Sequence, residues 1–107
     1  MSAAFQIRNR FEFALLPIRE TLFVQKNNRR VLFFSETKDY WSYAKFNEVM
    51  MQADASFFIC HSRLAVNLNR IYSIRGGMVT FSGGMQVKMC RSALRRTKKA
   101  WSNFIAE

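Results

Sequence analysis

The sequence contains few of the residues that break or cross-link a chain. Among its 107 residues are one proline, four glycines and two cysteines, so it has neither a flexible linker nor a disulfide framework. No apolar run reaches the roughly 18 residues of a membrane span. Basic residues from Arg8 onward interrupt the N-terminal region before the apolar part of a secretory signal can form. We therefore expect one domain, residues 1–107, in the cytoplasm.

Acidic residues are also scarce. Seventeen Lys and Arg face seven Asp and Glu, a net charge of +10, and no carboxylate occurs between Asp54 and Glu107. The second half of the chain thus lacks the paired acids of glycosidases and metal hydrolases. Cys60 and His61 are neighbours in sequence, but catalytic Cys and His normally meet through the fold, and one His with two Cys is too few for structural zinc. We expect no enzymatic activity, metal or cofactor, and the basic excess indicates a polyanionic partner.

Half of the residues are hydrophobic, and many lie in short β-branched or aromatic runs separated by turn residues. These runs predict strands at residues 5–7, 11–15, 22–25, 30–34 and 64–67. Two Gly-Gly pairs, Gly76-Gly77 and Gly83-Gly84, predict two-residue hairpin turns that join strands 70–75, 78–82 and 85–90 into a meander. In its last strand Met85, Val87 and Met89 alternate with polar residues.

Two segments have a helical pattern instead. Residues 42–52 carry apolar side chains at helical spacing, with Ser42 as a possible N-cap, which predicts a short helix covering a sheet; the stripe is Tyr43, Phe46, Val49 and Met50. From Ser92 onward an apolar side is opposite a basic one, which predicts an amphipathic C-terminal helix. Its apolar residues are Leu94, Thr97, Trp101, Phe104 and Ile105, and its basic ones are Arg95, Arg96, Lys98 and Lys99.

The basic residues form three clusters along the chain: Lys26, Arg29 and Arg30 beside Asn27-Asn28; His61 and Arg63, with Arg70 and Arg75 beyond; and Lys88 and Arg91 with the basic side of the last helix. Phosphates require many cationic donors, whereas base edges require side chains with paired donors and acceptors, such as Arg and Asn. An ordinary solvated surface is the alternative, and the long stretch without acids favours nucleic acid.

Residues 57–71, Phe-Phe-Ile-Cys-His-Ser-Arg-Leu-Ala-Val-Asn-Leu-Asn-Arg-Ile, resemble the signature of the LytTR-type DNA-binding domain, and the likeness extends over nearly the whole chain. The resemblance implies a mainly β fold: an elongated multi-stranded antiparallel β-sheet assembly with one short covering helix and a C-terminal basic helix. It also implies that loops at one edge enter successive major grooves, from residues 27–30, 61–63 and 90–92. Family members usually follow a receiver domain, which 107 residues cannot contain.

This chain departs from the family pattern at its polar pair Ser62-Arg63, which is exchanged, and at Cys90-Arg91-Ser92, where an expected arginine is absent or displaced. We read Asn67 as a structural side chain that fixes the turn after its strand. A thiol switch that uses Cys60 and Cys90 is a further hypothesis, because both lie next to the segments expected at DNA, with two buried, inert thiols as the alternative.

We thus expect a sequence-specific, double-stranded DNA-binding transcriptional regulator. A second copy on an adjacent half-site and a regulatory protein are further partners. The alternatives are a protein-interaction module that has lost specific DNA reading, and a membrane-surface protein that uses the C-terminal helix, whose apolar stripe we expect to pack on the sheets instead. The residues expected at the DNA are Asn28, Arg29, Arg30, His61, Ser62, Arg63, Lys88, Arg91, Ser92, Arg95, Arg96, Lys98 and Lys99.

Overall fold

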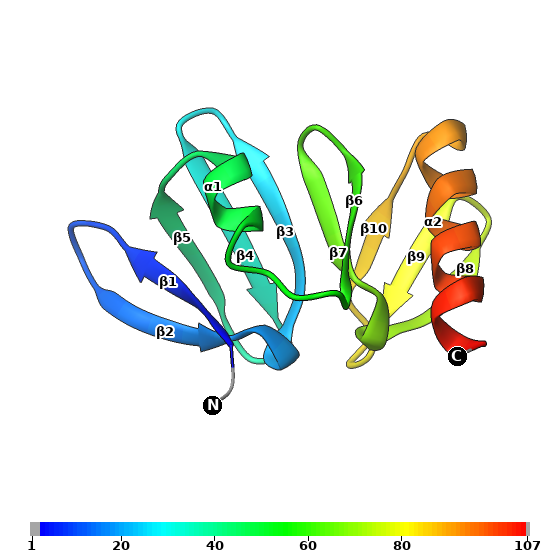
Figure 1. Ribbon diagram of the computed structural model, residues 1–107, viewed down its shortest axis with the longest axis horizontal. Coiled ribbons are helices and arrows are strands. Elements are labelled where there is room, and N and C mark those ends of the chain that lie inside the picture. Colours follow the sequence, from blue (N-terminus) through cyan, green and yellow to red (C-terminus); the bar gives the residue numbers. More distant parts are fainter. Residues whose placement is uncertain (1–2, 107) are drawn as a thin grey trace.

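The computed structural model describes residues 3–106, and within this range it contains ten strands and two α-helices (Figure 1). The strands are β1 (Ala4–Arg8), β2 (Phe13–Pro17), β3 (Thr21–Asn27), β4 (Arg30–Ser35), β5 (Asp39–Tyr43), β6 (Phe57–His61), β7 (Leu64–Asn67), β8 (Ile71–Arg75), β9 (Met78–Phe81) and β10 (Gln86–Lys88). The helices are α1 (Phe46–Met50) and α2 (Arg91–Ile105), with two 3-10 turns, η1 (Ile18–Glu20) and η2 (Leu68–Arg70).

The strands form three antiparallel sheets in the orders β1-β2, β5-β4-β3-β7-β6 and β10-β9-β8. Figure 1 shows the five-stranded sheet in the middle, the β1–β2 ribbon at one end and α2 at the other. The longest dimension is 38 Å. The mainly β antiparallel fold expected from the sequence is confirmed, as is the three-stranded meander.

Each face of the central sheet has its own core. On one face Val24 and Phe33 pack with Phe5 of the ribbon and with Val49 of α1. On the other face Phe23 packs with residues of the third sheet and of α2. The residues Thr21 to Val24 of β3 are all buried, because this strand lies between the two cores. Its continuous apolar run is typical of a strand covered on both faces.

The covering helix begins later than the sequence suggested. Ser42 is not an N-cap: it is buried in β5, where its hydroxyl accepts a hydrogen bond from the Arg8 amide (3.0 Å) and donates one to the Arg8 carbonyl (3.1 Å). Tyr43 also lies in β5 and is exposed. Phe46 and Val49 are buried against the sheet, so the covering role is confirmed. The helical spacing from residue 42 was misleading because pairing with β4 and contacts to β1 outweigh a local periodicity.

Two further strands, β5 and β6, were not predicted as separate elements. Both occupy edges of the five-stranded sheet. An edge strand has a partner on one side only, so its sequence carries a weaker apolar pattern. In β6 the pattern is also interrupted by a β-bulge, since Ile59 pairs with Ala65 and His61 with Leu64, leaving Cys60 as the extra residue.

The first Gly-Gly turn is confirmed and the second has a different length. Gly76 and Gly77 have φ values of 59° and 80° and join β8 to β9 directly. Gly83 and Gly84 also have positive φ, but the Phe81 amide donates to the Met85 carbonyl (2.8 Å), which leaves a three-residue loop of residues 82–84. The alternation expected for residues 85–90 is confirmed, with Met89 buried and its polar neighbours exposed.

Helix α2 packs its apolar side on the sheets, as expected. Thr97 is fully buried, as is Ala93, which the sequence interpretation had not included. Leu94, Trp101 and Phe104 are partly buried against the same core. Ile105 was placed wrongly: it is 62% exposed, because adjacent helix residues face different directions and Phe104 occupies the packed side. The side with Arg95, Arg96, Lys98 and Lys99 is exposed.

Candidate nucleic-acid interface

Two of the three predicted loops lie at the same edge of the central sheet because of strand direction. Strand β3 is antiparallel to both β4 and β7, so the turn that ends β3 and the turn that begins β7 are neighbours. The Lys26 amide donates to the Arg63 carbonyl (2.8 Å), which ties the two turns together. Figure 1 shows both turns at the upper edge, together with the start of α2.

The first loop is a tight turn of Asn28 and Arg29, closed by the pairing of Asn27 with Arg30. Asn28 has a φ of 58°, a left-handed conformation that asparagine tolerates better than most residues. Arg29 is exposed at the tip.

Arg30, by contrast, is held on the sheet. Its guanidinium carbon lies 4.4 Å from the centre of the Trp41 ring and 5.9 Å from that of Tyr43, a cation–π arrangement. Hydrogen bonding from Arg10 is the main cause that lowers the pKa of the Tyr43 hydroxyl, and the charges of Arg10 and Arg30 lower it further. The cross-strand aromatic residues therefore restrict Arg30 but leave Arg29 free to contact a ligand.

The second loop is ordered by its own histidine. His61 Nδ1 accepts a hydrogen bond from the Arg63 amide at 3.1 Å, so the ring proton is carried by Nε2. His61, Ser62 and Arg63 are all exposed. The Cys60 bulge directly precedes them, and bulges re-aim the side chains that follow.

The third region is the junction of β10 and α2. Cys90 precedes the helix without a side-chain cap, and Arg91 and Ser92 are exposed in its first turn. Arg91, Arg95 and Lys98 line a shallow hollow of about 270 Å³ together with Leu94. Arg96 and Lys99 lie on another side of the helix, one turn apart.

Helix α2 is joined to the second loop through the bulge. The Arg96 guanidinium donates to the carbonyl of Cys60. The Thr97 hydroxyl lies 2.8 Å from the Ala93 carbonyl oxygen and 3.2 Å from Cys60 Sγ. Hydrogen bonds therefore connect all three regions: the first to the second at Lys26 and Arg63, and the second to the third at Cys60 and Arg96.

The two cysteines differ in environment. Cys60 is buried, and burial raises the pKa of its thiol to about 11. Cys90 is exposed, and hydrogen bonds from Ala93 and Ser92 lower the pKa of its thiol. The alternative of two buried, inert thiols is therefore wrong for Cys90 and agrees with the environment of Cys60.

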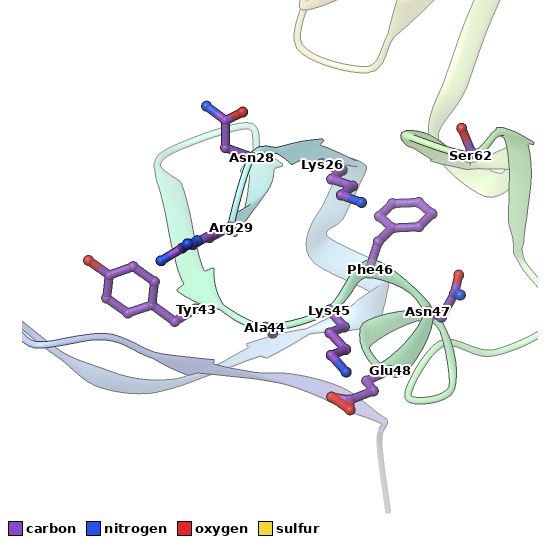
Figure 2. A pocket seen from close by; sticks show the side chains of 10 residues that line it. All are labelled: Lys26, Asn28, Arg29, Tyr43, Ala44, Lys45, Phe46, Asn47, Glu48 and Ser62. Atoms are coloured by element: carbon purple, nitrogen blue, oxygen red, sulfur yellow. The ribbon is translucent and has the colours of Figure 1, made fainter.

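A hollow of about 750 Å³ lies between the first and second loops (Figure 2). Lys26, Arg29 and Lys45 line it, with Glu48 as the one acidic residue in the lining; the others are Asn28, Tyr43, Ala44, Phe46, Asn47 and Ser62. Lys45 was missed in the sequence because it is an isolated basic residue in a segment interpreted as helix. It is remote in sequence from both loops, so only the fold brings it to them.

All the side chains expected at DNA are exposed. The fold brings Asn28, Arg29 and Ser62 to one hollow and places the residues of α2 beside the second loop. Asn67 is confirmed as structural: it is fully buried, its Nδ2 donates to two main-chain carbonyls at 3.2 and 2.9 Å, and its Oδ1 accepts from the Asn69 amide.

Neither a metal site nor a spanning helix is found in the part of the chain that the structure describes. Within residues 3–106 no group of three His, Cys, Asp or Glu side chains is placed to hold a metal ion. Over the same residues neither helix has the length and apolarity needed to cross a bilayer.

Exposed basic loops gathered at one edge of an antiparallel β fold define a nucleic-acid-binding class of domain. The model of the LytTr DNA-binding domain family matches residues 12–102, and the chain belongs to this family. The same fold occurs in the LytTr DNA-binding domain of a methyl-accepting/DNA response regulator from Bacillus cereus, with a TM-score of 0.76 and 15% identity over 94% of this chain and 97% of that one. Comparison with curated proteins yields no relative. Family membership makes this chain a DNA-binding domain with double-stranded DNA as its partner, in a family without enzymatic activity.

Proposed function

We propose that the chain is a transcriptional regulator that recognises a specific sequence in double-stranded DNA, with residues 1–107 acting as one domain. The observation that carries this proposal is the hydrogen-bonded connection of three exposed basic loops at one edge. Because the loops are tied to each other, their spacing is fixed before DNA arrives. A fixed spacing supports simultaneous entry of the loops into successive major grooves.

Base contacts are assigned to the loop tips. Arg29, Arg63 and Arg91 carry the guanidinium forks that fit guanine O6 and N7, and Asn28 can pair with adenine. His61 offers Nε2–H as a donor because its Nδ1 already accepts from the Arg63 amide. Arg30 is assigned to holding the first loop through Trp41, as its side chain is already engaged there.

Phosphate contacts are assigned to the exposed lysines and to the hollow between the loops. Lys26 and Lys45 place two cationic side chains around one space that has a single carboxylate in its lining. A DNA strand that passes from the first loop to the second would place a phosphate there. Lys88, Arg95, Lys98 and Lys99 extend the basic surface along α2.

Lys45→Ala tests the hollow. We expect weaker binding to all DNA sequences alike, with the slope of log K against log salt reduced by about 0.9, the value for one lost phosphate contact. Lys38→Ala is the matched control, because Lys38 is an exposed lysine paired with Glu12 (3.5 Å) on a loop outside this interface. Equal effects of the two substitutions would remove the hollow from the interface.

The function itself is tested by selecting a random duplex pool with the purified protein at about 150 mM salt, where non-specific electrostatic binding is already weakened. We expect enrichment of one motif. Two short half-sites about one helical turn apart would indicate that a second copy binds beside the first. Binding without enrichment of any sequence would contradict specific recognition.

The second candidate function is a protein-interaction module. It is favoured by one observation, the cluster of exposed apolar side chains Phe11, Phe13 and Leu15 on and next to β2. Competition with bulk DNA separates the two functions, because a protein interaction at that surface is indifferent to DNA.

A further inference from the structure

The β1–β2 ribbon has one satisfied edge and one open edge. Hydrogen bonds Asn9 N to Glu12 O and Ile18 N to Ala3 O fix which residues pair across the ribbon. Since bonded pairs recur at every second residue, the main-chain groups of Phe13 and Leu15 point away from β1. Within residues 3–106 no group accepts a hydrogen bond from either amide.

On the other edge of the ribbon the two corresponding amides are both engaged. The Gln6 amide donates to Gln52 Oε1 (2.9 Å), and the Arg8 amide donates to Ser42 Oγ (3.0 Å). The ribbon is therefore fixed to the domain through β1, while β2 presents free main-chain donors and acceptors. An open edge of this kind is a template for a further strand.

The side chains on this edge are apolar and unusually exposed. Phe13 is 78% exposed and Leu15 is 71% exposed, and Phe11 in the preceding turn is 78% exposed. Phe13 and Leu15 lie on the same face of β2 and line a shallow hollow of about 340 Å³. Clustered apolar exposure of this kind marks an interaction site.

The charged side chains around the open edge of β2 determine which kind of partner can bind to it. The Arg8 guanidinium lies 5.0 Å from the centre of the Phe13 ring, and Arg10 lies over Phe11. The nearby carboxylates are already paired, Glu12 with Lys38 and Glu20 with Arg19. A second copy of this chain, at net charge +10, would be repelled, whereas an acidic segment would be attracted. In Figure 1 β2 also lies on the side of β1 away from the loops assigned to DNA.

We propose that the open edge of β2 binds an extended acidic segment of a partner protein, which adds to the ribbon as a third strand. Its main chain pairs with the Phe13 and Leu15 amides. Its apolar side chains cover Phe13 and Leu15, and one of its carboxylates pairs with Arg8, whose guanidinium lies over Phe13. This surface is distinct from the DNA interface, so both ligands bind at once.

The test uses the full chain saturated with duplex DNA and a fluorescein-labelled peptide of alternating aspartate and valine. Fluorescence anisotropy should show saturable binding, and a lysine–valine peptide should not bind. Phe13→Ser and Leu15→Ser should each weaken binding about tenfold, the loss expected when one large apolar contact is removed. Neither substitution changes charge, so purely electrostatic binding would be unaffected by them.

Two controls define the site. Tyr72→Ser removes an equally exposed aromatic side chain (77%) from another edge strand, β8, and should leave peptide binding unchanged. Arg8→Glu should abolish binding of the aspartate peptide and permit binding of the lysine peptide. DNA affinity should be the same in the charge-neutral variants Phe13→Ser, Leu15→Ser and Tyr72→Ser, and circular dichroism checks that each variant is folded.

Four results would overturn the proposal. The first is the absence of saturable binding, and the second is equal binding of the two peptides. The third is a loss of DNA affinity in the Phe13 and Leu15 variants, which would place this edge in the DNA interface. The fourth is a wild-type dimer in sedimentation that Leu15→Ser abolishes, which would make a second copy the occupant.

Discussion

Arg96 is an exposed arginine on a helix that faces DNA in our proposal, yet its guanidinium is committed to the protein. It donates to the Cys60 carbonyl at the bulge that precedes the second loop. Arg96→Gln removes a hydrogen bond from a charged donor, worth about 1.5–3 kcal/mol when fully formed. Because the side chain is exposed, we expect about 1 kcal/mol of lost stability and a melting temperature lower by about 4–8 °C.

Arg96→Gln should weaken DNA binding because it displaces residues 61–63, and not because it removes a contact to a phosphate. If Arg96 aims residues 61–63, its loss lowers the affinity for the selected sequence and weakens discrimination at the bases they contact, with little change in the salt slope. Lys99→Gln is the matched control, since Lys99 lies one turn along the same side of α2 and its side chain forms no ion pair within residues 3–106. For Lys99 we expect a slope reduced by about 0.9 and an unchanged melting temperature. A reduced salt slope with an unchanged melting temperature for Arg96→Gln, as expected for Lys99→Gln, would refute this reasoning.

Three further predictions rest on single contacts. In the native protein Cys90 should react with iodoacetamide well before Cys60, because burial raises the pKa of the Cys60 thiol to about 11. Mass spectrometry of the labelled sites checks this order. A peroxide treatment that leaves DNA affinity unchanged would exclude the thiol switch. Asn67→Ala should lower the free energy of unfolding by about 2–4 kcal/mol in urea melts, since it leaves buried main-chain carbonyls without donors, and a loss below about 1 kcal/mol would contradict its structural role. Arg91→Ala should cost about 1–3 kcal/mol in DNA binding and relax the sequence preference, whereas Lys98→Ala should weaken cognate and scrambled DNA alike; equal losses on both DNAs for Arg91→Ala would remove it from the base contacts.

Much of the fold could be predicted because its signals are local. The Gly76-Gly77 hairpin needs only two adjacent residues that accept positive φ, and α2 needs only a periodic apolar side. The sequence-based predictions failed where a contact between residues far apart in the sequence determines the local structure. Ser42 carried a plausible helical spacing, but its hydroxyl is satisfied by Arg8, 34 residues earlier, and the segment is a strand.

The candidate site shows the same division. The basic clusters and the family resemblance were sufficient to list exposed residues near residues 28, 61 and 91. They did not separate Arg29, which is free at its tip, from Arg30, which stacks on Trp41 of the next strand. They also missed Lys45, because a single lysine carries no pattern until the fold sets it beside two loops.

The sequence by itself determined the charge, most of the short strands, the basic last helix and the family, because each depends on composition or on neighbours along the chain. Only the tertiary structure decided that hydrogen bonds tie the three loops together, that Arg96 bonds to a bulge 36 residues away, and that β2 keeps an open apolar edge. These features depend on which strands pair and in which direction. Strand pairing is set by long-range burial and main-chain hydrogen bonding, which the sequence around each residue does not specify.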